Sequence, residues 1–251
     1  MGSKEMKKAV LVTGSGRGIG AAVARLAAQQ GYAVAVNYVS DTAAAKAVVD
    51  EIRAQGGHAC LVQGDVGSED EVKRLFAEAE AALGPLYGVI NNAGITGRIG
   101  KFVAADPEAI ERIFRVNVLG TMHCCRAALR SFAASGTRGV IVNVSSIAAV
   151  TGSPNEYVHY AASKSAIDAF TLGLAREVAP DGVRVCGVAP GMTLTDIHAA
   201  AGEPGRPARV VSRIPQGRLA SPEEIAEPIV WLLSDAASYM TGAMLRCSGG
   251  V

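Results

Sequence analysis

The sequence predicts an α/β protein with one doubly wound domain, in which a seven-stranded parallel sheet carries helices on both faces. Two observations lead to this prediction. Short apolar runs rich in valine alternate with longer stretches that carry alanine, leucine and charges at helical spacing. The apolar runs are hydrophobic at almost every position, which is typical of parallel strands that helices cover on both sides.

The predicted strands cover residues 8–13, 32–37, 58–63, 86–92, 139–145, 183–189 and 243–247. The predicted helices cover residues 19–30, 42–54, 69–83, 107–134, 158–179 and 222–234. Ser68 and Ser221 each precede a first turn with acidic residues, so both are predicted as helix N-caps. The longest stretch without a clear element, 190–220, is predicted as a lid over the substrate.

The single domain is expected to span residues 6–251. Hydrophobic residues make up 49% of the chain and charged residues 19%, a composition that suits a large buried core. Residues 1–5 are either a cloning remnant or a natural extension, so they take no part in the fold prediction.

The charge balance excludes partners that need a strongly charged surface. Lys and Arg total 24 and Asp and Glu total 23, so no global field would recruit nucleic acid or an anionic membrane. No run approaches the roughly 18 apolar residues of a membrane span, and the start of the chain lacks a signal peptide. The five cysteines have no C-x-x-C spacing and suit reduced thiols. We therefore expect a cytoplasmic protein without a metal site.

A glycine-rich turn follows the first predicted strand and leads into a helix. It comprises Thr13, Gly14, Ser15, Gly16, Arg17, Gly18, Ile19 and Gly20. Glycines let a ligand approach the backbone closely, and the amides and dipole of the helix N-terminus favour anions. Turns also collect glycine for steric reasons alone. Between a strand and a helix, however, the cluster predicts a site for the pyrophosphate of a dinucleotide, as in Rossmann-type folds.

The glycine spacing T-G-x-x-x-G-I-G resembles that of the classical short-chain dehydrogenase/reductase (SDR) family. Further motifs of that family recur in order along nearly the whole chain: Asp65-Val66, Asn91-Asn92-Ala93-Gly94, Asn117, Ser146, Tyr160-x-x-x-Lys164 and Pro190-Gly191. The resemblance implies a nicotinamide cofactor and an oxidoreductase activity on CH–OH donors.

The resemblance also implies which residues meet the cofactor. Asp65 and Val66 would line the adenine, while Asn92, Ala93 and Gly94 would back the ribose and nicotinamide. A clasp for the carboxamide would come from Pro190, Gly191, Thr193 and Thr195. Asp65 also has a purely structural alternative, as an Asx-turn or helix-start residue.

The end of the second predicted strand bears on the choice between NADP(H) and NAD(H). Residues 36–40, with Asn37 and Ser40 as candidate contacts, include no carboxylate that would accept ribose hydroxyls and repel a 2′-phosphate. Arg17 in the glycine loop resembles the residue that meets this phosphate in NADP-using relatives, although Val39 stands where many of them carry a basic or hydroxylic residue. The sequence therefore favours NADP(H).

Tyr160 and Lys164 are four residues apart, so a helix places both on one face. At about 4 Å and an effective dielectric constant of about 20, an ammonium stabilises a phenolate by about 4 kcal/mol. That would lower the pKa of the phenol by about 3 units and make it an acid/base at neutral pH. By itself the spacing is more typical of a surface pair, and only the other motifs along the chain favour a catalytic role.

The resemblance assigns roles around this pair. Ser146 would hold the substrate oxygen, with Ser145 as its competitor, and the backbone of Asn117 would hold a water in a proton relay. Asn117 as a buried helix asparagine is the structural alternative. Tyr157 is expected to contact substrate or to pack, and His159 is expected to be structural.

The sequence thus predicts an NADP(H)-dependent oxidoreductase that moves hydride between nicotinamide and a carbonyl or secondary alcohol. A keto-acyl or sugar dehydrogenase using NAD(H) and a non-catalytic nicotinamide-binding scaffold are the alternatives, and the intact set Asn117, Ser146, Tyr160 and Lys164 disfavours the scaffold. The family resemblance implies a homotetramer formed through the long helices after the fourth and fifth strands and through the closing strand. Arg246 departs from the usual pattern near the tail. Neither 190–220 nor 96–102 identifies the substrate.

Overall fold

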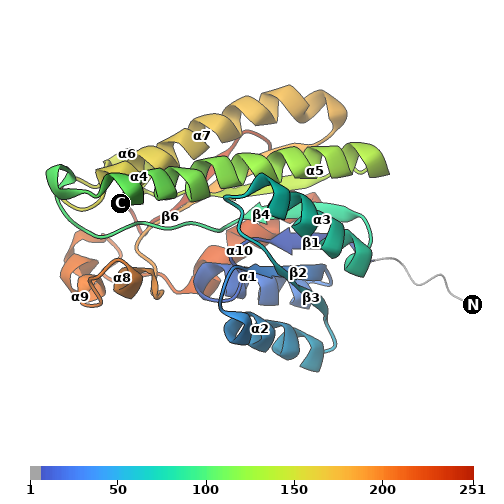
Figure 1. The fold of residues 1–251 in the computed structure, drawn as a ribbon, viewed down its shortest axis with the longest axis horizontal. Coiled ribbons are helices and arrows are strands. Elements are labelled where there is room, and N and C mark those ends of the chain that lie inside the picture. The colour runs from blue at the N-terminus through green and yellow to red at the C-terminus, as the bar shows by residue number, and fades with distance from the viewer. Residues whose placement is uncertain (1–6) are drawn as a thin grey trace, which may run out of the picture.

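The computed structural model describes residues 7–251, without the side chain of His198. Seven strands form one sheet in the order β3-β2-β1-β4-β5-β6-β7, and each neighbouring pair is parallel (Figure 1). The strands are β1 Ala9–Val12, β2 Ala33–Tyr38, β3 His58–Gln63, β4 Leu86–Asn91, β5 Val140–Val144, β6 Arg184–Pro190 and β7 Met244–Cys247. The predicted fold class is confirmed.

The principal helices lie where the sequence predicts them, mostly to within one residue. They are α1 Gly18–Gln29, α2 Thr42–Ala54, α3 Glu69–Leu83, α4 Pro107–Phe114, α5 Thr121–Ser135, α7 Val158–Val178 and α10 Pro222–Leu233. Both predicted caps are present. The Ser68 side chain accepts a hydrogen bond from the Glu71 amide, and Ser221 forms a reciprocal capping box with Glu224.

Alternate strand residues build two separate cores. On β1, Val10 and Val12 pack into a cluster with residues of α1, α2 and α10, whereas Ala9 and Leu11 pack into a cluster with residues of α3, α5 and α7. Figure 1 shows these two groups of helices on opposite sides of the sheet. Because both faces are buried, the strands are hydrophobic throughout, as expected.

The predicted helix 107–134 is wrong as one uninterrupted element. It contains a π-helical segment, η2 Arg115–Gly120, between α4 and α5. Asn117 lies inside this segment, and its side chain bonds both backbone groups of Ile95. This tertiary anchor explains why helical periodicity alone does not reveal the interruption, and π-helical turns occur frequently at functional sites.

The stretch 190–220 is not devoid of regular elements, contrary to expectation. It contains α8 Ile197–Ala200, α9 Arg206–Val210 and the 3₁₀ turn η4 Val211–Arg213. These segments are too short for a periodic pattern to be recognised. The same holds for η1 Phe102–Ala104, α6 Ala148–Thr151, η3 Ala179–Asp181 and η5 Asp235–Ala237. The two ends of the stretch meet where Thr193 pairs with Ala220.

The strand order reverses at β1, because β2 and β3 extend to one side and β4 lies on the other. In such sheets ligands bind in the crevice beyond the carboxyl ends of the two central strands. The glycine turn follows β1 and the Asn-Asn-Ala-Gly turn follows β4, so both predicted motifs border this crevice. Within residues 7–251, no helix is both long and apolar enough to cross a membrane.

Candidate active site

The glycine turn forms a tight cradle in front of α1. Gly14 and Gly18 have φ values of +62° and +54°, which side chains rarely adopt. A Cβ on Gly20 would lie 2.5 Å from both Asn92 Nδ2 and Gly14 O, so the start of α1 packs directly against the turn. Arg17 is the N-cap residue of α1, and its side chain makes no capping hydrogen bond within residues 7–251. The first turn of α1 carries no acidic residue. Its amides and dipole are therefore available to an anion.

Three residues predicted to meet the cofactor hold this cradle in shape. Asn37 accepts a bond from the Gly14 amide (3.0 Å), and its Nδ2 donates to Gly64 O (3.0 Å). Asn92 donates from Nδ2 to Gly14 O (3.0 Å). Ser15 is buried, and its hydroxyl donates to the carbonyl of Val12 (2.7 Å). These polar groups are satisfied inside the protein, and their contact with a cofactor stays a prediction.

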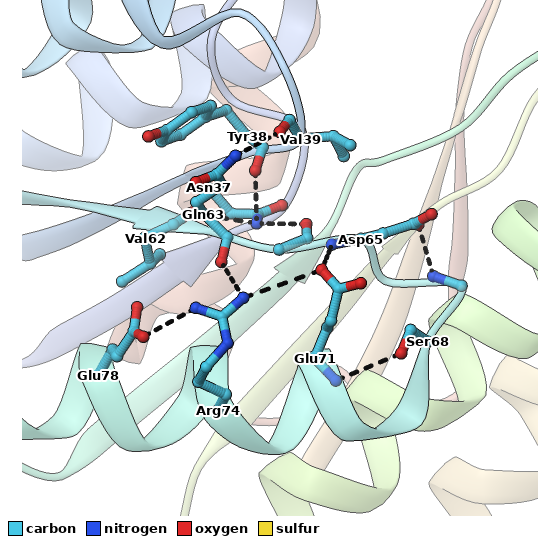
Figure 2. A network of polar contacts seen from close by, with 12 residues as sticks. Asn37, Tyr38, Val39, Val62, Gln63, Asp65, Ser68, Glu71, Arg74 and Glu78 are labelled. Atoms are coloured by element: carbon cyan, nitrogen blue, oxygen red, sulfur yellow. Dashed lines mark hydrogen bonds and ion pairs between the residues drawn. The ribbon is translucent and has the colours of Figure 1, made fainter.

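The carboxyl ends of β2 and β3 form a second polar network, drawn in Figure 2. Gln63 donates from Nε2 to the Val39 carbonyl (3.0 Å), and Arg74 donates to the Gln63 carbonyl (3.1 Å). The Val39 side chain itself is 53% exposed, and Ser40 is exposed as well. The network therefore fixes the backbone of this segment while its side chains remain at the surface.

Asp65 adopts the turn that its structural alternative predicts. Its Oδ1 accepts the Gly67 amide (2.8 Å), and its own amide donates to Glu71 Oε2 (2.9 Å) (Figure 2). Val66 is buried against Gly120, where a Cβ on the glycine would lie 2.8 Å from Val66 Cγ2. The pair thus connects β3 to the π-helical segment.

Two charged residues bear on the choice of cofactor, one in the glycine turn and one after β2. Arg17 is exposed and forms no ion pair within residues 7–251. Asp41, the first carboxylate after β2, caps α2 by accepting the Ala44 amide (3.0 Å). The Arg17 guanidinium beside the cradle therefore has no ion-pair partner among residues 7–251. The Asp41 carboxylate, in contrast, already accepts a hydrogen bond.

Tyr160 lies buried on α7 beside β5, with the Ser146 side chain close to its phenol. Burial raises the pKa of Tyr160 to about 12, although the nearby Ser146 side chain acts in the opposite direction. Ser145 turns the other way, because its hydroxyl donates to Asp168 and to the Lys164 carbonyl. The structure thus brings Ser146, and not its competitor, to the phenol.

Lys164 is buried one turn further along α7. Its Nζ donates to the Val144 carbonyl at the end of β5 (2.8 Å) and lies 5.8 Å from the centroid of the Tyr160 ring. Burial lowers the pKa of Lys164 to about 8. The sequence-based expectation that the pKa of the phenol lies toward neutrality is wrong for this structure, because burial is the largest influence on the Tyr160 pKa and raises it.

Asn117 is brought to the same place by the π-helical segment. Its Oδ1 accepts the Ile95 amide (2.9 Å), and its Nδ2 donates to Ile95 O and to Ser163 Oγ. A Cβ on Gly94 would lie 3.3 Å from Asn117 Oδ1 and 3.4 Å from Lys164 Nζ. All four predicted catalytic residues therefore gather at the carboxyl ends of β4 and β5, with Gly94 between Asn117 and Lys164.

The beginning of the stretch 190–220 packs against the glycine cradle. The Gly191 amide donates to the Cys247 carbonyl (2.8 Å), and the carbonyl of Pro190 accepts the Ile147 amide. Thr193 is buried and donates to Gly191 O. Thr195 Cγ2 lies 3.3 Å from the position of a Cβ on Gly18, so the predicted clasp reaches the phosphate end of the site.

Sequence reasoning missed two charged residues beside Tyr160. Tyr157 packs edge-on against Tyr160, with ring centroids 5.2 Å apart, which agrees with its predicted packing role. The guanidinium carbon of Arg206, in α9, lies 5.0 Å from the centroid of the Tyr157 ring, and Arg206 pairs with Glu156. Fifty positions separate the two charges. Because Glu156 and Arg206 are so far apart in the sequence, no local pattern connects them. The only available signal was that Glu156 stands next to Tyr157 and close to Tyr160.

The cysteines are free thiols, as predicted. Cys124 and Cys125 are buried, and burial raises the pKa of Cys125 to about 12 and that of Cys124 as well. Neither thiol is therefore activated as a thiolate nucleophile.

Three comparisons with known proteins identify the family. The family model described as Enoyl-(Acyl carrier protein) reductase matches residues 14–251. The uncharacterized oxidoreductase YgfF of Escherichia coli (strain K12) is 48% identical, over 96% of this chain and 98% of its own. The 3-oxoacyl-[acyl-carrier-protein] reductase FabG of Staphylococcus aureus (strain Mu50 / ATCC 700699) is 34% identical, over 98% of this chain and 99% of its own.

A solved structure agrees with this assignment. The crystal structure of a dehydrogenase/reductase from Sinorhizobium meliloti 1021 superposes with a TM-score of 0.90 at 32% identity, covering 97% of this chain and 94% of that chain. The matches span the cradle, the Tyr160 site and the lid together. The chain therefore belongs to the short-chain dehydrogenase/reductase family, and it is an oxidoreductase acting on CH–OH donors.

Proposed function

We propose that the protein is an NADP(H)-dependent reductase or dehydrogenase of carbonyls and secondary alcohols, with Tyr160 as its acid/base. One observation carries the proposal: the buried Tyr160 ring lies 5.8 Å from Lys164 Nζ, and Gly94 and Asn117 lie beside the same ammonium. Cysteine nucleophiles are disfavoured by burial, and the Tyr160 group is the arrangement that suits proton transfer to an oxygen.

The cradle fits a dinucleotide. Gly14 and Gly20 leave no room for side chains, and the N-terminus of α1 presents its amides without a competing acidic residue. The cradle and the end of α1 would hold the pyrophosphate, and Gly94 would leave space beside Lys164. When bound, the nicotinamide supplies or accepts the hydride.

The chain's own residues then move the proton. Ser146 donates a hydrogen bond to the substrate oxygen and holds it near the Tyr160 hydroxyl. In reduction Tyr160 gives its proton to that oxygen, and in oxidation it removes the proton. Because the pKa of Lys164 is about 8, its ammonium forms near neutral pH and favours the phenolate. Asn117 holds the Ile95 backbone beside this group.

The preference for NADP(H) is supported by the uncompensated charge of Arg17. A 2′-phosphate beside the end of β2 would meet this guanidinium in a charge-assisted hydrogen bond. The first carboxylate after β2, Asp41, accepts the Ala44 amide and would not need to be displaced. Val39 adds no charge of either sign at this position.

Two measurements test the proposal. Oxidation of NADPH with a panel of carbonyl compounds, including a sugar and a 3-oxoacyl thioester, would identify a substrate. Tyr160→Phe is expected to lower kcat by at least about a hundredfold, which is the usual scale of acid/base catalysis. NADPH binding, followed by its fluorescence, should persist in this variant. Retained turnover in Tyr160→Phe would refute the assignment, and a higher kcat/KM with NADH would refute the cofactor preference.

We also propose that the protein acts as a homotetramer in the cytoplasm. Leu119 is exposed and lines a hollow of about 530 Å³ together with Leu129 and Phe170. Leu172 of α7 is exposed as well. Trp231 of α10 is exposed on a separate face. Light scattering after size-exclusion chromatography tests this, because Leu119→Glu should reduce the assembled mass. An unchanged mass in Leu119→Glu would rule out this face as an interface.

A further inference from the structure

A buried ion pair joins the lid to the loop that precedes the catalytic helix. Arg206 of α9 is only 1% exposed, and Glu156 is 8% exposed. Arg206 donates from Nε to Glu156 Oε2 (3.2 Å), and its Nη2 bonds the same oxygen. Removing two charges from water is unfavourable unless they pair closely, so this contact strongly favours one relative placement of lid and loop.

The same loop carries further ties to the segments that surround the substrate space. The carbonyl of Glu156 accepts the Gly100 amide (2.7 Å), and the Ile99 amide donates to Ala201 O of the lid (3.2 Å). Three segments are thus joined to one another: residues 96–102, the loop around Glu156 and the stretch 190–220.

The ion pair is one side chain away from Tyr160. The guanidinium carbon of Arg206 lies 5.0 Å from the centroid of the Tyr157 ring. Tyr157 in turn meets Tyr160 edge-on, with an interplanar angle of 87°. Arg206 also approaches Met192 Sδ (3.3 Å) at the base of the lid. A shift of Arg206 would therefore move the ring that packs against the proposed acid/base.

We propose that Glu156 and Arg206 are positioning residues, a buried latch that holds α9 against the start of α7 and orients Tyr160 through Tyr157. The inference rests on the proposed role of Tyr160, which it deepens. The lid then has two parts: its beginning lies near the cradle, and its later part is held against the start of α7 by the latch.

The charge of Arg206 also reaches the phenol. Burial has the largest effect on the pKa of Tyr160 and raises it; Ser146 and Arg206 each lower this pKa, and Tyr157 raises it. The Lys164 ammonium lies 5.8 Å from the ring centroid. Loss of Arg206 should therefore shift the Tyr160 titration, seen in the pH profile of kcat for alcohol oxidation, to higher pH. A residue that merely stabilised the lid would leave this profile in place.

The lid offers a matched control. Arg209 pairs with the other oxygen of Glu156 (2.9 Å), and Arg213 approaches that oxygen at 4.0 Å with a side chain that is 69% exposed. Arg206→Met and Arg213→Met each remove a guanidinium near the Glu156 carboxylate. The first guanidinium is buried, and the second is in solvent. Exposed pairs contribute little, so Arg213→Met should keep kcat within about twofold of wild type.

In Arg206→Met we expect kcat to fall by about tenfold to a hundredfold, because small misplacements of reacting groups have effects of this size. The pH profile should move upward, and Arg206→Lys should restore part of both. Equal kcat values in Arg206→Met and Arg213→Met, with unshifted profiles, would overturn the proposal. If Arg206→Met does not fold, Tyr157→Leu removes the connecting ring while leaving the ion pair; an unchanged kcat in that variant would also overturn it.

A measurement without turnover separates this inference from the proposed function. In Glu156→Gln, amide hydrogen exchange of residues 201–213 should be at least about tenfold faster than in Arg213→Met, because the lid loses its latch. Equal exchange in the two variants would refute the latch whatever the activity. Turnover retained by Tyr160→Phe would refute the proposed function while leaving the exchange result standing.

Discussion

Replacing Lys164 with methionine removes a buried ammonium and keeps a side chain of similar length. Burial lowers the pKa of Lys164 from 10.5 to about 8. At 1.36 kcal/mol per pKa unit, the charged form therefore costs the folded protein about 3 kcal/mol. The variant also loses the hydrogen bond to the Val144 carbonyl, which offsets about 1 kcal/mol. At pH 7 we expect Lys164→Met to be more stable than wild type by about 2 kcal/mol.

The pH dependence of this difference has a definite sign. Between pH 8 and 10.5 the unfolded chain retains the Lys164 proton that the folded protein has released. The unfolded state then binds more protons, so this group makes wild-type stability rise with pH over that window. Lys164→Met lacks the contribution, and its advantage should vanish by about pH 10. Tyr160, whose pKa is raised to about 12, is present in both proteins and cancels in the comparison.

Urea unfolding without cofactor, followed by circular dichroism at about pH 7 and about pH 10, measures the difference. Lys164→Arg is the control, because arginine stays charged throughout and should show no rise. A variant less stable than wild type at pH 7, or a stability difference independent of pH, would refute the reasoning that burial dominates the titration of Lys164.

Further predictions concern the cradle and the cofactor preference. Arg17→Ala should lower kcat/KM for NADPH at least about tenfold, the worth of a charge-assisted hydrogen bond, while kcat/KM for NADH changes little. Asn37→Ala leaves the Gly14 amide and the Gly64 carbonyl without their partner, and should cost about 2 to 4 kcal/mol in urea unfolding. Gly20→Ala should weaken NADPH binding in a fluorescence titration, because its Cβ would fall 2.5 Å from Gly14 O. Wild-type values in any of these three assays would contradict the corresponding contact.

The sequence by itself determined the elements and their sheet. Continuous apolar runs, helical periodicity and the serines at Ser68 and Ser221 depend on neighbours a few residues away, and the structure has them where they were predicted. The Tyr160 and Lys164 pair is equally local, since one helix carries both. The fold class and the family followed from these patterns and from the order of the motifs.

The tertiary structure decided where the polar groups point. Asn37 turns inward to hold Gly14, 23 positions away, and Asp65 closes a turn with Gly67. For Asn37, sequence spacing cannot distinguish this orientation from contact with a cofactor, because its partner Gly14 follows a different strand. The turn at Asp65 is local and is the structural alternative that the sequence offers. The π-helical segment at Asn117 likewise depends on Ile95, 22 positions away.

Electrostatics and the lid were also decided by tertiary structure. The spacing of Tyr160 and Lys164 suggested that the ammonium attracts the phenolate in a partly solvated site. The structure buries both side chains, and the ammonium donates to the Val144 carbonyl at the end of β5. Glu156 and Arg206 meet only because the lid returns to α7. Local sequence specifies periodicity and backbone sterics, but desolvation and long-range pairing exist only once distant segments have packed together.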